Sequence, residues 1–298
     1  MSKRIVSFSN PFHLSVRMGQ LIIFNKETED EVMRPIEDIG YLVLDHPQIT
    51  FTVGLMQLLA EQNIATVFCD ARHHPASMLL HLDTHHIQAE RFRAQLSASE
   101  PLRKQLWQQT VKAKIRNQAM VLELAGVASP ALANLAAKVA SGDATNCEGQ
   151  AARIYFKRLF GENFQRQREG PPPNPSLNYG YTIVRAAVAR ALAGSGLLVT
   201  SGIHHHNKYN SFALADDIME PFRPFVDELI FRQMRQAADY HYLTKERKAE
   251  FLGLLHTDCI WKDGMSPLSV AMESVSANLA KCFEGEGRRL QFPEIPMP

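Results

Sequence analysis

The spacing of apolar residues changes near residue 83, and this change limits the architectures that the chain can adopt. Before it, short runs of β-branched and aromatic residues separated by turn residues predict strands. These runs cover residues 5–8, 12–16, 21–24, 41–44 and 65–68. Met18-Gly19 separates two of them as a tight hairpin would, and residues 53–60 have helical spacing despite Gly54. Residues 1–82 are therefore predicted to form a small β-rich domain with one helix.

From residue 83 onward, apolar residues recur every three or four positions, which is typical of helices that bury one face. One such stripe consists of Leu102, Leu106, Trp107, Thr110, Val111, Lys114 and Ile115. Four prolines within residues 169–176 forbid a helix there and predict an extended or turned segment. The fold class predicted is α+β, with a small N-terminal β-rich domain followed by a larger all-α domain at residues 83–298.

The charge of the chain is distributed unevenly. The net charge is only +1, but residues 1–100 carry −4, residues 101–200 carry +8 and residues 201–298 carry −3. A basic middle third is typical of a surface for a polyanion, although solvated helix faces give the same count. The candidate DNA-binding cations form two clusters: Lys112, Lys114 and Arg116, then Arg153, Lys157, Arg158, Arg166 and Arg168.

The four cysteines and the apolar runs restrict the compartment. Cys69, Cys147, Cys259 and Cys282 lie far apart with no C-x-x-C pair, which argues against a thiolate zinc knuckle and for a reducing compartment. Arg190 interrupts the most apolar stretch, so no membrane span is expected. We expect a cytoplasmic protein with no membrane partner.

Histidines and acids gather in one short segment. Three consecutive histidines at residues 204–206 are followed by Asp216, Asp217 and Glu220, whose spacing can place carboxylates on one helix face. Pro221 should break or restart that helix at Glu220. Imidazole nitrogen and carboxylate oxygen together suit Mg²⁺ or Mn²⁺. The alternative is a polar turn before a capped helix.

A second acid has an unusual position. Glu148 begins a helical run and lies on the same face as Ala152, where a carboxylate is unfavourable unless it is paired or bound to a cation. Alternatively, Asn146 caps this helix and Glu148 only interacts with the helix dipole. A hard-metal site together with a basic third of the chain favours phosphodiester chemistry.

Other motifs carry less weight. His81 and His85 have the i,i+4 spacing of zinc ligands, but no Glu lies between them as in H-E-x-x-H, so a linker is favoured there. The chain has no P-loop, dinucleotide fingerprint or G-x-S-x-G elbow, so kinase, dehydrogenase and hydrolase functions lack support.

Three blocks, in this order, resemble the CRISPR-associated integrase of spacer acquisition (the Cas-one family), most closely its type II form. The blocks are Glu148-Gly149-x-Ala151-Ala152, Asn174-x-x-Leu177-Asn178-Tyr179-Gly180-Tyr181, and the run from His204 through Asp227. The resemblance covers nearly the whole chain, because a β domain followed by a helical domain is also the layout of that family.

The resemblance implies a site and a reaction. It implies that the catalytic metal ligands for Mg²⁺ or Mn²⁺ are Glu148, His205 and Glu220, with Asp217 as a supporting carboxylate. The residues alone leave His204, His205 and His206 open, and the family register selects His205. Many relatives have Asp where Glu220 stands. The implied activity is DNA endonuclease and integrase, in which a fragment 3′-hydroxyl attacks a repeat phosphodiester.

The resemblance also implies partners. These are double-stranded DNA (the prespacer and the CRISPR repeat), a second copy of the chain bound through residues 1–82, and a small second adaptation protein in a hetero-hexameric complex. The implied process is antiviral defence by spacer acquisition. Two alternatives stay open, a catalytically silent DNA-binding scaffold and a general metal-dependent nuclease outside CRISPR immunity.

Overall fold

The computed structural model describes residues 4–71, 75–79, 85–236 and 242–297. The chain falls into two compact units, Met1–His86 and Ile87–Pro298, each of which is described by itself. The first is rich in strands and the second mostly helical, so the predicted α+β class is confirmed. The predicted boundary between residues 82 and 83 lies outside the described residues.

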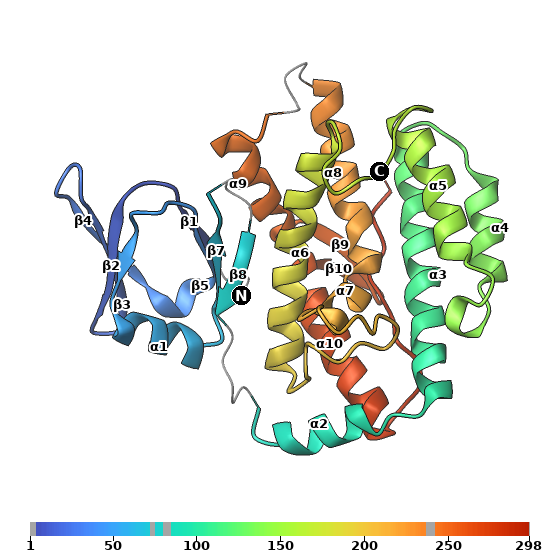
Figure 1. Cartoon of the computed structure of the whole chain (residues 1–298), viewed down its shortest axis with the longest axis horizontal. Helices are drawn as coiled ribbons and strands as arrows, with labels where there is room; N and C mark the ends of the chain where they lie inside the picture. Colours follow the sequence, from blue (N-terminus) through green and yellow to red (C-terminus); the bar gives the residue numbers. More distant parts are fainter. Residues whose placement is uncertain (1–3, 72–74, 80–84, 237–241, 298) are drawn as a thin grey trace. The chain divides into compact units, whose positions relative to one another are not determined.

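Two four-stranded sheets form the first unit (Figure 1). One sheet contains β1 (Arg4–Phe8), β5 (Ile39–Leu44), β7 (Ala65–Cys69) and β8 (Pro75–Leu79), in that order. The other contains β4 (Glu31–Pro35), β3 (Gln20–Asn25), β2 (Phe12–Arg17) and β6 (Thr50–Phe51), in that order. In the first sheet β1, β5 and β7 are parallel and β8 is antiparallel.

The local sequence explains these elements. Met18 and Gly19 have φ angles of 50° and 71°, which suit the two-residue turn joining β2 to β3. Thr52 caps helix α1 (Val53–Glu61), because its hydroxyl accepts a hydrogen bond from the Leu55 backbone amide. One hydrophobic cluster contains residues of both sheets and α1. The five predicted strands and the helix are confirmed, whereas β4, β6, β8 and the short 3₁₀ helix η1 (Ile36–Asp38) were not foreseen.

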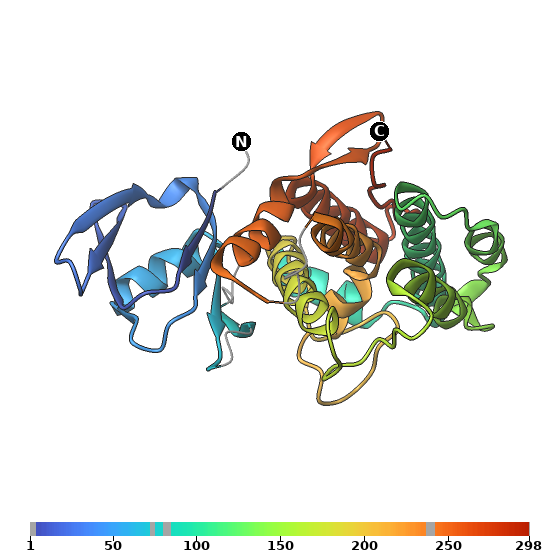
Figure 2. The same ribbon diagram turned by 90° about the horizontal axis from the view of Figure 1, so that it is seen from above.

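The second unit is a bundle of helices (Figure 2). The α-helices are α2 (Gln88–Leu96), α3 (Glu100–Leu124), α4 (Pro130–Lys138), α5 (Cys147–Phe160), α6 (Asn174–Gly194), α7 (Ala213–Ile218), α8 (Arg223–Gln236), α9 (Lys245–Gly253) and α10 (Leu268–Glu284). In the described part of this unit, three short 3₁₀ helices lie between them: η2 (Ser141–Asp143), η3 (Glu220–Phe222) and η4 (Leu254–His256). Helix α6 contacts α8 and α10, and α3 contacts α4, α5 and α8. Helix α3 therefore brings the 147–160 and 220–236 segments together.

The prediction of an all-helical second domain is wrong in one place. Strands β9 (Asp258–Trp261) and β10 (Gly264–Pro267) form an antiparallel hairpin, and Ile260 also pairs with Glu294 of the C-terminal segment. The hairpin is short and lies between helices, so it left no clear period-2 pattern in the sequence. Within the described residues, no helix is both long and apolar enough to cross a membrane.

Candidate active site

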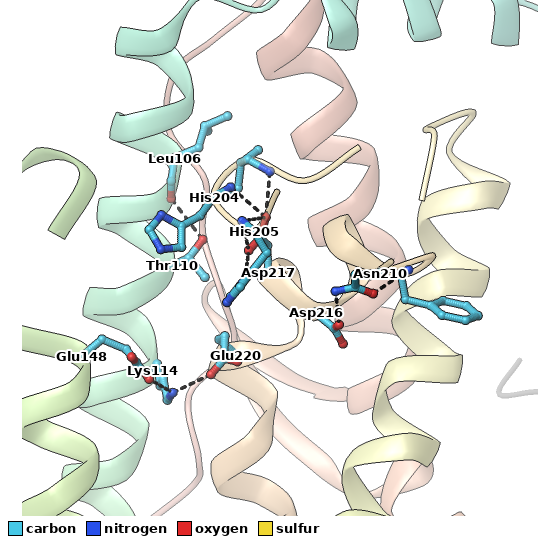
Figure 3. Close-up of polar contacts among 12 residues, drawn as sticks. Leu106, Thr110, Lys114, Glu148, His204, His205, Asn210, Asp216, Asp217 and Glu220 are labelled. Carbon is cyan, nitrogen blue, oxygen red and sulfur yellow. Dashed lines mark hydrogen bonds and ion pairs between the residues drawn. The ribbon is translucent and has the colours of Figure 1, made fainter. Parts of the chain in front are cut away.

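A buried lysine on α3 lies at the centre of the site. Lys114 belongs to the core-facing side of the helix, and its side chain is 8% exposed. Its Nζ contacts a carboxylate oxygen of Glu148 and lies 2.5 Å from Oε2 of Glu220 (Figure 3). Burial acts to lower the pKa of Lys114, but Glu220 and Glu148 outweigh it and raise this pKa above its ordinary value. Lys114 is therefore a cation held between two acids.

Glu148 is placed by the start of α5. The Asp143 carboxylate accepts hydrogen bonds from the amides of Cys147 (2.9 Å) and Glu148 (3.0 Å). Asn146 has a left-handed conformation (φ 52°), and its side chain accepts from the Gly149 amide, so the predicted cap is confirmed. These contacts satisfy the free amides of the helix terminus and fix Glu148 beside α3.

Glu220 is placed by the break at Pro221. The chain leaves α7 and passes through η3 into α8, so the predicted interruption is confirmed. The side-chain amide of Asn117 in α3 donates a hydrogen bond to the Pro221 carbonyl (2.8 Å), which ties η3 to α3. The Arg223 Nε lies 2.9 Å from Glu220 Oε1. Burial acts to raise the pKa of Glu220, but Arg223 and Lys114 outweigh it, and this pKa lies below its ordinary value.

The histidine loop is held by one buried carboxylate. Asp217 has no exposed surface and accepts hydrogen bonds from the amides of Ile203 (2.7 Å), His204 (2.9 Å) and His205 (3.2 Å). It also contacts Nδ1 of the His205 ring at 2.5 Å. A Cβ at Gly202 would lie 2.5 Å from the His205 carbonyl oxygen, so only glycine allows the loop to approach this closely.

The three adjacent histidines have different environments. Because Nδ1 of His205 is engaged with Asp217, Nε2 is the ring nitrogen left to bind a metal. The Asp217 hydrogen bond outweighs burial and raises the pKa of His205, and the Glu220 charge acts in the same direction. His204 stacks on Trp107 with ring centroids 4.2 Å apart, and burial lowers its pKa. His206 is exposed.

The donor set suits a hard divalent ion. Over the described parts of the chain, no three His, Cys, Asp or Glu side chains already lie together as a metal site. Instead, the Lys114 ammonium occupies a cation position between two carboxylates. The Glu220 Oε2 atom is buried and faces this ammonium. Two carboxylates and one imidazole nitrogen are ligands that Mg²⁺ and Mn²⁺ accept, so the residues fit the predicted ion once the ammonium has moved.

A cavity of about 510 Å³ opens beside these groups. It is lined by Lys114, Gln118, Glu148, Ala152, Arg153, Phe156, Lys157, Phe164, Gln165, Arg166, Tyr181, Glu220, Arg223 and Asp227. Its wall therefore combines the two acids with cations from α5, α8 and the loop before α6.

The predicted DNA-binding cations are distributed over several surfaces. Arg153 and Lys157 are exposed and line this cavity. Lys112 and Arg116 line a separate cleft of about 390 Å³, together with Lys262 and Arg289. Lys114 lies apart from these two cations, because it lines the first cavity with Arg153 and Lys157, and its contact with DNA stays a prediction. It is two residues from each of Lys112 and Arg116, a spacing that turns a side chain to the opposite side of a helix.

Of the remaining predicted cations, two donate hydrogen bonds within the protein and the third is exposed to solvent. Arg158 donates to the Ala128 carbonyl (2.9 Å). Arg166 donates to the side-chain oxygens of Asn174 (3.0 Å) and Asn178 (2.7 Å), so it fastens the proline-rich loop to α6. Arg168 is exposed.

A buried polar group next to the site was missed by sequence reasoning. Asp227 of α8 accepts hydrogen bonds from the hydroxyls of Tyr155 (3.0 Å) and Tyr181 (2.5 Å). Burial raises the pKa of Asp227 to about 6, although the two tyrosines act against this rise. The signal available in the sequence was a charged residue on the apolar face of a helix.

Among the described residues, Asp216 and the histidines before α2 take no part in the carboxylate pair. Asp216 accepts a hydrogen bond from the side-chain amide of Asn210 (2.8 Å) and is not paired with Lys114 as Glu148 and Glu220 are. Of the second histidine group, His81 lies outside the described residues, and His85 stacks on His86 at 4.6 Å.

Comparison with known proteins identifies the family. The family model for "CRISPR associated protein Cas1" matches residues 5–253. A "CRISPR-associated endonuclease Cas1" from Neisseria meningitidis serogroup C (strain 8013) is 36% identical over 99% of this chain and 97% of the relative. The chain belongs to the Cas1 family.

Solved structures extend the comparison at the level of the fold. A "Casposase bound to integration product" has a TM-score of 0.78 and 17% identity, covering 98% of this chain and 93% of that one. A chain of a "Cas6-RT-Cas1--Cas2 complex" has a TM-score of 0.75 and 20% identity, covering all of this chain and 36% of that one. The architecture is thus shared with proteins far from this Cas1 family member in sequence.

Proposed function

We propose that this Cas1 family member is a DNA endonuclease and integrase that inserts short DNA fragments into a CRISPR array. The observation that carries this proposal is the meeting of Glu148 and Glu220 at one cation position, beside a histidine oriented by a buried carboxylate. The name of the Neisseria relative supports the nuclease activity, and the fold of the casposase, which was solved with an integration product, supports integration.

The residues of the site have separate tasks in the proposed reaction. Glu148, Glu220 and Nε2 of His205 would hold Mg²⁺ or Mn²⁺, which when bound neutralises charge on the reacting phosphate. Asp217 keeps the His205 ring in one orientation, and in the neutral ring a proton on Nδ1 facing Asp217 would leave Nε2 to bind the ion. Arg153 and Lys157 attract the DNA backbone to the cavity.

The reaction is a transesterification. The 3′-hydroxyl of the fragment loses its proton as its oxygen bonds to a repeat phosphorus, while the phosphorus–oxygen bond to the neighbouring deoxyribose breaks and that oxygen takes up a proton to become a new 3′-hydroxyl. The number of phosphodiester bonds is unchanged, so positioning and charge stabilisation supply the rate. Attack by water at the same phosphorus gives the endonuclease activity.

We further propose that the first unit forms a homodimer contact. Strand β4 is an edge strand of its sheet and exposes Val32 (40%) and Met33 (54%), while Met18 at the β2–β3 turn is 96% exposed. An edge strand with apolar side chains is a surface that pairs with another chain. The fold likeness to a chain of a Cas1–Cas2 complex supports a small second adaptation protein as a further partner in a hetero-hexamer.

Strand transfer on a labelled branched DNA with Mn²⁺ tests the function. The branched substrate runs the transesterification in reverse, so the second adaptation protein is not needed. The protein as it is should resolve the branch, His205→Ala should not, and His206→Ala, an exposed neighbour, should retain activity. If all three proteins bind the DNA and none resolves it, the scaffold alternative replaces the integrase. If His206→Ala rather than His205→Ala is inactive, the ligand assignment is wrong.

A further inference from the structure

Lys114 occupies the position where the two proposed metal-binding acids meet. Its Nζ contacts Glu148 and lies 2.5 Å from Glu220 Oε2, while the second oxygen of Glu220 is paired with Arg223. The ammonium donates a hydrogen bond to Glu148 and pairs with Glu220, so it occupies the point that both carboxylates face. A different cation that binds both carboxylates has to take the same place.

An acceptor for the ammonium lies one helical turn away. Gln118 follows Lys114 at i+4 on α3, lines the same cavity, and is 1% exposed. Its Oε1 atom is buried and accepts no hydrogen bond in the parts of the chain that the structure describes. A buried carbonyl oxygen without a donor is unfavourable, so a donor that reaches Gln118 Oε1 would be stabilised by a hydrogen bond there.

We infer that Lys114 is a built-in counter-ion that neutralises Glu148 and Glu220 when no metal is bound, and that a divalent ion displaces its ammonium toward Gln118 Oε1. The inference rests on the metal site proposed above. Ammonium and metal then compete for the same oxygens, so Lys114 stabilises the metal-free protein and weakens metal binding. If Lys114 had only a structural role, it would instead stabilise the metal-free protein and favour metal binding as well.

Metal binding in the absence of DNA tests this competition. Calorimetric titration of the full-length protein with Mn²⁺ gives the Kd, and thermal unfolding in EDTA gives the Tm of the metal-free form. Lys114→Met removes the ammonium at nearly constant volume. It should tighten Mn²⁺ binding by about 10- to 100-fold and lower the Tm in EDTA by roughly 10 °C, because both acids lose the ammonium and Arg223 remains paired with Glu220.

A second variant tests the destination of the ammonium. Gln118→Met removes the acceptor and should weaken Mn²⁺ binding by about 3- to 10-fold in the presence of Lys114. In the double variant the Gln118 effect should vanish, since no ammonium has to be received. Arg190→Met is the matched control, because Arg190 is another buried cation (8% exposed), paired with Glu273 away from this site. It should lower the Tm without changing the Kd.

The outcomes separate this inference from the proposed function. A folded Lys114→Met protein that binds Mn²⁺ no more tightly than the parent overturns the competition. A Gln118→Met effect that persists without Lys114 overturns the proposed destination. If neither the parent nor Lys114→Met binds Mn²⁺ at millimolar concentration, the metal site and the inference fall together. Normal competition combined with absent strand transfer overturns only the proposed function.

Discussion

Replacing Asp227 should change the pH dependence of stability in a direction opposite to that of most carboxylates. Asp227 is 1% exposed and accepts the hydroxyls of Tyr155 and Tyr181. Burial raises its pKa from 3.8 to about 6, so the folded state binds this proton more tightly than the unfolded chain. The stability that this proton contributes is complete below pH 3.8 and is lost as the pH rises through about 6.

The gap between 3.8 and about 6 corresponds to about 3 kcal/mol. Asp227→Asn is neutral at every pH and lacks this contribution. The unfolding free energy of the parent minus that of the variant should therefore fall by about 3 kcal/mol between about pH 4 and pH 7. Taking the difference cancels the other titrating groups that both proteins share.

Urea unfolding followed by tryptophan fluorescence measures this difference. Both tryptophans, Trp107 and Trp261, lie in the same unit as Asp227, so the signal reports the unfolding of that unit. Tyr181→Phe removes a hydrogen bond that holds the Asp227 pKa down and should move the midpoint of the pH curve upward. A difference curve that is flat, or that rises with pH, would refute the reasoning.

Two other substitutions probe packing and DNA contact. Gly180→Ala should lower the unfolding free energy by about 1–3 kcal/mol, because its Cβ would lie 2.4 Å from the Val226 Cγ1 atom. Gly253→Ala, with no atom within 4 Å of the added Cβ, is the matched control, and equal losses in the urea assay would contradict this account. Lys157→Gln and Arg153→Gln should each reduce the slope of log affinity against log salt by about 0.9 in a fluorescence-anisotropy titration. An unchanged slope for both would place the DNA on another surface.

Local signals in the sequence place two of the proposed ligands on their elements, whereas the family register selects His205 from the three histidines. Pro221 predicts the break that presents Glu220, and Asn146 predicts the helix start that presents Glu148. The position of Lys114 depends instead on helical phase. It falls on the apolar stripe of its helix, which indicates a buried cation, but its neighbours Lys112 and Arg116 make the segment look like one basic patch. A count of charges along the chain ignores the position of each residue around the helix axis, and that position decides which face its side chain occupies.

Two of the strands that were missed, β4 and β8, lie at the edges of their sheets. Four of the five residues of β4 are exposed, and β8 begins at Pro75, so both are edge strands whose pattern is set by the neighbouring strand. The hairpin of β9 and β10 joins the C-terminal segment through the Ile260–Glu294 pair, a contact that a local pattern cannot indicate. Local periodicity therefore predicts the elements of the core, and long-range pairing determines the rest.

Each proposed ligand is held by a different polar group on a different part of the chain. Asp143 fixes the amide end of α5, Asn117 fixes η3 against α3, and Asp217 fixes the histidine loop. The second block of the family resemblance supplies none of the proposed ligands. Tyr181 of that block bonds Asp227 in the cavity wall, and Gly180 allows α6 to lie against α8. The sequence blocks that distinguish the family thus contain two kinds of residue. Some are proposed metal ligands, and others set the distances between the helices that carry those ligands. Substituting a group of the second kind should alter metal affinity and activity together, because the three ligands would no longer meet at one point.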